Sequence, residues 1–174
     1  MKKILVIGSG GAGKSTFAKR LGGVLKLEVI HLDSLFWNPG WVETPKDKWR
    51  VMVEELVKGD SWIIDGNYGG TLDIRLAACD GVIFLDVPRL ICIRRVLKRV
   101  ALYRKERRPD MAAGCPERFN AEFIKYIWDY PRHRKPALVE KLDSYSRTKA
   151  VTILRSQTEI EGFLVSQCDI KQFV

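Results

Sequence analysis

Residues 8–16, GSGGAGKST, combine closely spaced glycines with a lysine and three hydroxyl side chains. Gly8, Gly13, Lys14 and Ser15 fit the phosphate-binding pattern G-x-x-x-x-G-K-[ST]. Glycines let successive backbone N–H groups face a bound phosphate, and a helix that begins near the lysine adds its positive end. We expect Lys14 to reach the β- and γ-phosphates of ATP and Ser15 to hold Mg²⁺. The residues predicted to bind the nucleotide phosphates are Gly8, Gly10, Gly11, Ala12, Gly13, Lys14, Ser15 and Thr16.

The sequence on either side of this loop favours phosphate binding over an ordinary glycine turn. The apolar segment ILVI precedes the loop, and a helical pattern begins at its end, near Lys14. A strand, a glycine loop and a helix in this order form the structural context in which the pattern binds phosphate.

Three carboxylates follow other strand-like segments, at Asp33, Asp65 and Asp86. Ligands of open parallel sheets bind beyond the carboxyl ends of the strands, so these side chains are candidates for chemistry. Asp33 either takes a proton from an attacking hydroxyl or caps the short helix that follows it. Asp65 is the first candidate for Mg²⁺ or its waters, with turn capping as its alternative. Asp86 is the lesser candidate for the metal role.

Strand-like and helix-like segments alternate along the chain. Short, apolar, β-branched segments suggest strands buried on both faces, at 2–8, 28–32, 61–65, 81–87 and 150–154. Helical patterns occupy 14–26, 45–58, 88–105, 117–130, 136–146 and 157–167. This alternation predicts an α/β fold with a five-stranded parallel sheet flanked by helices.

With 174 residues, the chain is long enough for one full core, so we expect a single domain over residues 1–174. Two regions extend beyond a minimal sheet. Residues 33–60 hold three of the five tryptophans around an Asn38-Pro39-Gly40 turn, and residues from about 104 to 116 form a charged loop with proline and glycine. Both are natural candidates for mobile flaps.

The sequence contains neither a membrane-spanning run nor a signal peptide, which predicts a soluble, cytoplasmic protein without membrane partners. The four cysteines and two histidines lack metal-site spacing. The formal charge is +9, and residues 89–108 hold nine basic side chains against Glu106 alone. Such a surplus favours an anionic partner, either nucleotide phosphates or a nucleic-acid backbone. No oligomeric state follows from these features.

The chain resembles the adenylate kinase-like branch of the P-loop kinases, and within it the bacterial DNA topology modulation proteins. The likeness rests on GSGGAGKST (8–16), HLDSLFW (31–37), WIIDGNY (62–68), FLDVPR (84–89) and FIKYIWDYPRHRKP (123–136). It implies a P-loop fold, a short lid at about 104–116 and an acceptor-binding flap at about 33–60.

The resemblance also implies roles for five arginines. Arg95 and Arg99 fall on the nucleotide-contacting arginines of the helix that leads into the lid. Arg132 and Arg134 would close over the transferring phosphoryl group, and Arg155 would border the adenine base. Positioned guanidinium groups suit phosphoryl transfer, because they stabilise the charge that spreads over the transferring group.

The sequence departs from adenylate kinases on the acceptor side. Asn67, Tyr68 and Gly69 stand where that family has an aromatic residue, a proline and a phosphate-gripping arginine, and Asp33 stands in place of its acceptor contacts. A carboxylate there suits an acceptor hydroxyl, as in shikimate- or gluconate-type kinases. Arg75 is a possible substitute for the lost phosphate contact, and Trp37 could stack on an acceptor ring.

Two functions are consistent with these features. The first is an ATP- and Mg²⁺-dependent phosphotransferase of nucleotide-kinase type, which acts on a nucleotide or a small hydroxyl acceptor. The alternative is a nucleotide-switched, DNA-associated protein without kinase turnover, suggested by the basic segment. The sequence has no helix-turn-helix, zinc-finger or RNA-binding signature.

Overall fold

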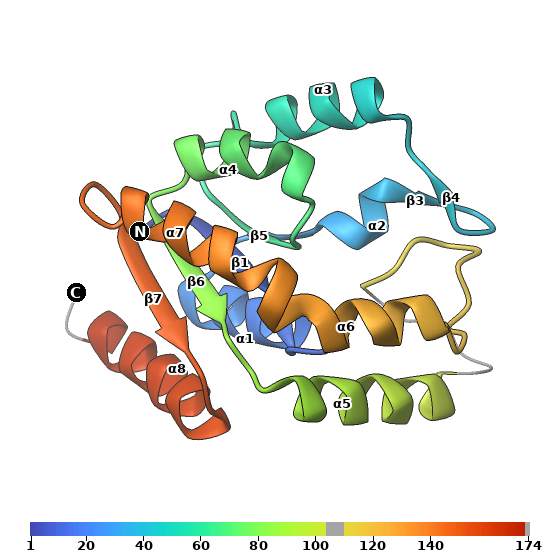
Figure 1. The fold of residues 1–174 in the computed structure, drawn as a ribbon. Helices are drawn as coiled ribbons and strands as arrows, with labels where there is room; N and C mark the ends of the chain where they lie inside the picture. Colours follow the sequence, from blue (N-terminus) through green and yellow to red (C-terminus); the bar gives the residue numbers. More distant parts are fainter. Residues whose placement is uncertain (104–109, 173–174) are drawn as a thin grey trace.

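Five parallel strands form the central sheet of the protein (Figure 1). The structure, a computed structural model, describes residues 1–103 and 110–172. The strands are β1 (Lys3–Gly8), β2 (Val29–His31), β5 (Trp62–Asp65), β6 (Gly81–Leu85) and β7 (Ala150–Leu154). Their order is β2-β5-β1-β6-β7, and each neighbouring pair is parallel. The predicted five-stranded parallel sheet is confirmed.

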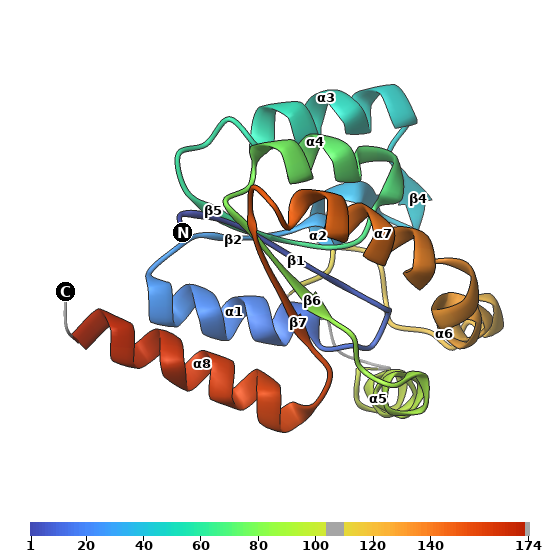
Figure 2. The ribbon, with the colours of Figure 1, turned by 60° about the vertical axis from the view of Figure 1, so that its left-hand side comes forward.

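Helices cover both faces of this sheet. They are α1 (Lys14–Leu25), α2 (Leu32–Phe36), α3 (Lys46–Leu56), α4 (Leu72–Ala78), α5 (Arg89–Leu102), α6 (Ala121–His133), α7 (Lys135–Tyr145) and α8 (Gln157–Gln172). Figure 2 shows α1 and α8 on one side of the strands and α3, α4 and α7 on the other. Among the described residues, no helix has the length and apolar character that crossing a membrane requires.

The alternation of side chains along β1 explains these layers. Ile4 and Val6 belong to the core beneath α1 and α8, whereas Leu5 and Ile7 belong to the core beneath α3, α4 and α7. All four are at most 1% exposed. A strand with both faces buried needs apolar residues at every position, and this explains the uninterrupted ILVI run.

Several elements differ from the sequence prediction. The helix predicted from 117 begins at Ala121, because the Asn120 side chain accepts a hydrogen bond from the Phe123 N–H and so fixes the first turn there. Sequence patterns missed α4 and a two-stranded hairpin formed by β3 (Trp37–Asn38) and β4 (Val42–Glu43), and they indicated α2 only as the short helix after Asp33. These elements are too short for the periodicity of a helix or strand to stand out.

The carboxyl ends of the strands lie on one side of the molecule, away from both termini. Figures 1 and 2 both show α5 and α6 on that side, opposite the two chain ends. The loop after β1, α2 after β2, the turn after β5 and α5 after β6 therefore meet around one edge of the sheet.

Candidate active site

The glycine-rich loop joins β1 to α1 and packs tightly against its neighbours. Gly8 and Gly11 have positive φ angles, 148° and 76°. A Cβ atom on Gly8 would lie 2.5 Å from the Leu85 carbonyl oxygen, and one on Gly11 would lie 2.4 Å from the Cys92 carbonyl oxygen. These positions therefore require glycine, because a side chain would force the loop away from β6 and α5.

Lys14 begins α1 and bends back over the loop. Its Nζ donates to the carbonyl oxygens of Gly8 and Ser9, both at 3.0 Å. Burial lowers the pKa of the Lys14 ammonium, and the nearby carboxylates of Asp33 and Asp65 oppose that shift. The lysine thus lies within electrostatic reach of both predicted acidic groups.

Asp65 ends β5, beside His31 at the end of β2. These residues are partners in the sheet register, and His31 Nδ1 lies 2.9 Å from Asp65 Oδ1. The Asp65 residue is only 4% exposed. Its hydrogen bond raises the pKa of His31, since the carboxylate favours the charged imidazolium. Ser15 and Asp65 line the same cavity, and a hydroxyl with a carboxylate is a donor set that fits Mg²⁺.

Asp33 lies in the first turn of α2, directly after Leu32. It is not the capping residue, because His31 holds that position and makes no side-chain capping bond. Instead, Asp33 Oδ1 accepts a 2.6 Å hydrogen bond from the Tyr68 hydroxyl. Burial, with the Asp33 charge, raises the pKa of Tyr68 and keeps its phenol protonated. Asp33 also lines the cavity.

Arg75 stabilises the turn after β5 through hydrogen bonds to its backbone. Its guanidinium is fully buried and donates to four backbone carbonyls: those of Gly66, Asn67, Tyr68 and Thr71. Burial lowers its pKa to about 10. Arg75 does not line the cavity, so it is not placed to substitute for the lost phosphate contact. The hydrogen bonds support Tyr68 in a left-handed conformation, with a φ of 33°.

Asn67 connects this turn to the glycine loop and to α6, a role that the sequence did not reveal. Its Oδ1 accepts from the Gly8 N–H at 3.0 Å, and its Nδ2 donates to the Tyr126 hydroxyl at 3.3 Å. The only sequence signal was the DGNY motif itself. At Asn67 the sequence departs from the adenylate kinase pattern, and this same residue links the glycine loop to α6 through its side-chain hydrogen bonds.

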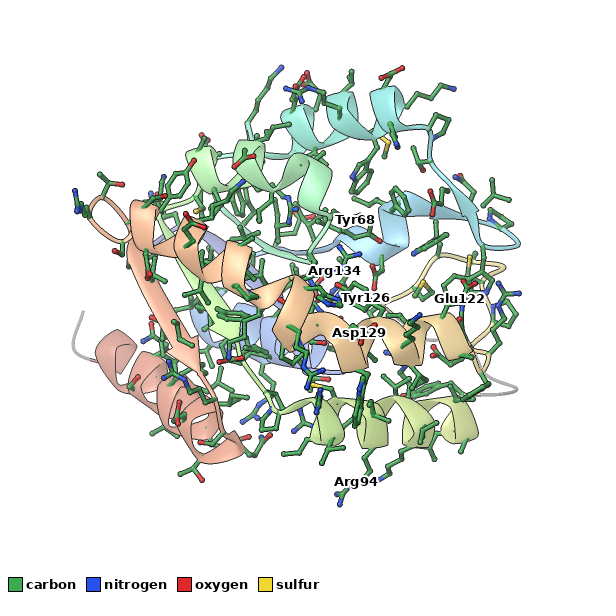
Figure 3. All side chains as sticks on the ribbon, viewed as in Figure 1. Tyr68, Arg94, Glu122, Tyr126, Asp129 and Arg134 are labelled. Atoms are coloured by element: carbon green, nitrogen blue, oxygen red, sulfur yellow. The ribbon has the colours of Figure 1, made fainter. Side chains whose placement is uncertain are left out.

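The predicted arginines of α5 face the glycine loop. Arg95 donates to the Ala12 carbonyl and to Gln157 Oε1, both at 2.9 Å. Arg99 forms a 2.8 Å ion pair with Glu117. Both arginines line the cavity, whereas Arg94 is exposed and points away from the molecule in Figure 3. The four-residue spacing puts Arg95 and Arg99 on one face of the helix.

The three remaining predicted arginines occupy different environments. Arg134 stacks over the Tyr126 ring, with its guanidinium carbon 4.8 Å from the ring centroid, and Figure 3 shows these side chains beside each other. Arg132 and Arg134 are both exposed, and neither lines the cavity. Arg155 lies outside the cavity wall too; its Nε is 3.8 Å from Asp86. Gln157 lines the cavity in its place, because α8 begins there.

Asp86 faces a separate, smaller cavity of about 230 Å³. Its carboxylate forms a 2.7 Å ion pair with Lys135 of α7. This position after β6 turns the side chain away from the phosphate-loop cavity. Asp65 is thus the better placed of the two candidates for the metal role.

The hairpin of the predicted flap touches the second part of the predicted lid, residues 110–116. Trp41 Nε1 donates to the Pro116 carbonyl at 3.1 Å, and the Gly40 N–H donates to the Gly114 carbonyl at 2.9 Å. Residues 104–109, the first part of the predicted lid, lie outside the described residues. These contacts make the hairpin and residues 110–118 one wall of the site.

A cavity of about 1420 Å³ brings these groups together. It exceeds the usual range for a single small ligand, so it has room for a nucleotide and a second substrate. One half is formed by the glycine loop, α1 and the inner face of α5. We call this the donor half. The other half is formed by α2, the hairpin, the turn after β5 and residues 110–118, and we call it the acceptor half.

The basic segment 89–108 is divided among several environments. Arg89 stacks on Trp128 at 3.9 Å from the ring centroid, Arg95 and Arg99 face the cavity, and Arg94 is exposed. Residues 104–108 lie outside the described residues. The described part of the segment is therefore not one continuous basic surface.

Three solved structures resemble the whole chain. A shikimate kinase from Acinetobacter baumannii, solved in complex with shikimate, has a TM-score of 0.63 and 15% sequence identity, and the match covers 99% of this chain and 93% of that one. A shikimate kinase from Bacteroides thetaiotaomicron has a TM-score of 0.54 and 20% identity, with 97% of each chain covered. An unliganded sugar kinase from Janibacter sp. HTCC2649 has a TM-score of 0.51 and 16% identity, with 98% and 92% covered.

Comparison of the sequence with known proteins identifies no family for this chain. No protein-family model matches the chain, and no curated protein sequence matches it. At such low identities, the structural likeness defines the fold, which is the α/β fold of the P-loop kinases. None of these three proteins is named for DNA topology, so they lend no support to that finer resemblance.

Proposed function

We propose that this protein is an ATP- and Mg²⁺-dependent phosphotransferase that moves the γ-phosphate of ATP to a small hydroxyl acceptor. The observation that carries the proposal is that Lys14 of the glycine loop and the carboxylate of Asp33 line one cavity. The P-loop kinase fold of the solved neighbours supports the same class of reaction. A nucleotide acceptor, which the adenylate kinase resemblance implies, is the less favoured form of this proposal.

The donor half binds the nucleotide in this proposal. The loop N–H groups and Lys14 hold the phosphates, Arg95 and Arg99 approach them from α5, and Gln157 borders the base. Ser15 and Asp65 hold Mg²⁺, which supplies positive charge that offsets the charge of the phosphates. Of the two arginines in the WDYPRHR segment, Arg134 is the better placed to approach the transferring group. Its guanidinium lies over the ring of Tyr126, which lines the cavity.

The acceptor half supplies the base. Asp33 removes the proton from the acceptor hydroxyl as its oxygen attacks the γ-phosphorus. The new bond joins that oxygen to phosphorus, and the bond from phosphorus to the β,γ-bridging oxygen breaks. The products are a phosphate ester and ADP, with the proton on Asp33. Tyr68 positions the Asp33 carboxylate through its 2.6 Å hydrogen bond.

The proposed division of the chain follows from these roles. Residues 1–174 form one P-loop kinase domain, in which about 33–60 is the acceptor flap and about 104–116 is the lid. The hydrogen bonds of Trp41 to Pro116 and of Gly40 to Gly114 support a flap and lid that meet over the bound substrates. A closed cavity excludes water and thus favours transfer to the acceptor over hydrolysis.

The test is label transfer from γ-³²P-ATP in the presence of Mg²⁺. The panel consists of nucleosides, nucleoside monophosphates, shikimate and small sugars, with products separated by thin-layer chromatography. We expect label in one organic phosphate ester. Label in inorganic phosphate alone, or no loss of label from ATP, would contradict the proposal.

A further inference from the structure

The acceptor half carries an unusual combination of carboxylates and aromatic rings. Asp33 and Glu43 line it together with the rings of Trp37, Trp41 and Tyr68. These side chains come from α2, the strands and the connecting turn of the hairpin, and the turn after β5. Their chemistry differs from that of the donor half, where lysine and arginine side chains predominate.

Three described cations, His31, Arg75 and Arg118, lie near this half. His31 is hydrogen-bonded to Asp65. Arg118 is exposed at the rim, with its guanidinium 5.8 Å from the Trp41 ring. Arg75 lies beneath the turn and donates to backbone carbonyls only, among its described hydrogen bonds. Arg118 lines the cavity from this exposed rim, where water screens its charge, and Arg75 does not line the cavity.

The carboxylates make this wall unfavourable for a negatively charged acceptor. A phosphate or carboxylate group on the acceptor would lie close to Asp33 or Glu43 when its hydroxyl is at the base. Like charges a few ångströms apart in a partly closed cavity repel strongly, because solvent screening is weak there. An uncharged acceptor avoids this penalty.

The aromatic rings provide a surface for a flat ligand. The Trp37 and Trp41 rings have centroids 5.4 Å apart and an interplanar angle of 70°, so they form a corner. Phe36 supports Trp37 from behind, at 5.1 Å and 86°, and also contacts Tyr68 at 4.7 Å. Rings held in this way keep their orientation when a ligand binds, and planar heterocycles stack on such rings.

We infer that the acceptor is an uncharged, hydroxyl-bearing ring compound of the nucleoside class, stacked against Trp37 with its hydroxyl at Asp33, and that phosphorylated forms of the same compound are rejected. The inference rests on the proposed function for the role of Asp33. Trp37, Trp41 and Glu43 are its specificity-determining residues.

The experiment measures binding to the acceptor half alone. The protein is first saturated with a non-hydrolysable ATP analogue and Mg²⁺, so that nucleosides and nucleotides cannot occupy the donor half. Calorimetric titration then compares each of the four ribonucleosides with its 3′- and 5′-monophosphates. The 3′-monophosphate retains the free 5′-hydroxyl, so it differs from the nucleoside only by the anion. We expect at least one nucleoside to bind about 10-fold or more tightly than either monophosphate.

Two pairs of variants test the residues involved. Trp37→Leu should weaken nucleoside binding by roughly 10-fold through lost stacking. Trp128→Leu is the matched control, since Trp128 is exposed on α6 and does not line the cavity, and it should leave binding unchanged. Glu43→Arg should narrow the preference for nucleoside over monophosphate by at least about threefold. Glu54→Arg on α3 should not, because Glu54 does not line the cavity.

The possible outcomes separate this inference from the proposed function. Tighter binding of a monophosphate than of its nucleoside would overturn the inference, and so would binding of none of these compounds to a protein that still binds the ATP analogue. Transfer of label to another acceptor would then leave the proposed function standing. A nucleoside that binds as expected but never receives label would support the inference and contradict phosphotransfer.

Discussion

The donor and acceptor halves of the cavity are built in different ways. The core of the donor half is one run of nine residues, Gly8 to Thr16, shaped by backbone conformation, with arginines added from α5. The acceptor half assembles side chains from α2, the hairpin, the turn after β5 and residues 110–118. In the proposed function, phosphate binding depends mainly on backbone geometry, whereas acceptor recognition depends on which side chains meet. The donor chemistry of a P-loop kinase can thus stay constant while its acceptor changes.

Among the substitutions in the donor half, loss of Lys14 should have the largest effect on activity. Lys14→Ala should lower kcat by about 10²- to 10³-fold, because it removes a positive charge beside the transferring phosphate. Steady-state ADP release measures the loss. Lys98→Ala, an exposed position on α5, is the control and should retain activity. Full activity of Lys14→Ala would show that the glycine loop does not hold the donor.

Substitutions at Arg75 test whether the turn after β5 depends on the hydrogen bonds from this buried guanidinium. Arg75→Met should lower the free energy of unfolding by about 2–3 kcal/mol, because buried carbonyls lose charged donors. Urea denaturation measures this change. Arg75→Lys should restore part of the stability through a smaller number of hydrogen bonds. Equal stability of Arg75→Met and the wild type would mean that the turn holds its shape without the guanidinium.

The neighbours Arg95 and Arg94 provide a matched pair within one helix. Arg95→Ala should weaken binding of the ATP analogue by about 10-fold, as expected for one charged hydrogen-bond donor. Arg94→Ala should leave binding unchanged, since this side chain is exposed and does not line the cavity. Calorimetry resolves the difference. Similar losses in both variants would favour a diffuse charge effect over a defined contact.

The smallest expected effect concerns the Tyr68 hydroxyl. Tyr68→Phe removes its hydrogen bond to Asp33 but keeps the ring in the aromatic cluster. A net contribution of about 1 kcal/mol predicts a decrease in kcat of about fivefold. KM for the acceptor should stay the same if Tyr68 only positions the base. A raised KM with unchanged kcat would assign the hydroxyl to acceptor binding instead.

Much of the sheet and of the donor half could be predicted from sequence. The run ILVI must be buried on both faces, and glycines at positions 8 and 11 reflect close backbone packing. The four-residue spacing of Arg95 and Arg99 also fixes them on one helix face. In each case the decisive information is local, so short stretches of sequence contain it.

The rest of the site depends on contacts between distant segments. Arg75 is cationic and lies near the DGNY motif, yet its burial beneath the turn turns it into a structural brace. Arg132 and Arg134 are two residues apart, but only Arg134 stacks on Tyr126. The contact of Trp41 with Pro116 joins segments 75 residues apart. No pattern in a single segment contains such relations.

Single-turnover transfer is the most direct test of the central claim, that the two halves together perform phosphotransfer from ATP to a hydroxyl. Excess protein is mixed with γ-³²P-ATP, Mg²⁺ and the acceptor found in the panel, and label is followed in the ester and in inorganic phosphate. The account predicts that wild-type protein labels the ester and that Asp33→Asn slows this step by at least about 10²-fold, while Asp47→Asn on exposed α3 does not. Equal rates for Asp33→Asn and wild type, or label that appears only in inorganic phosphate, would contradict it.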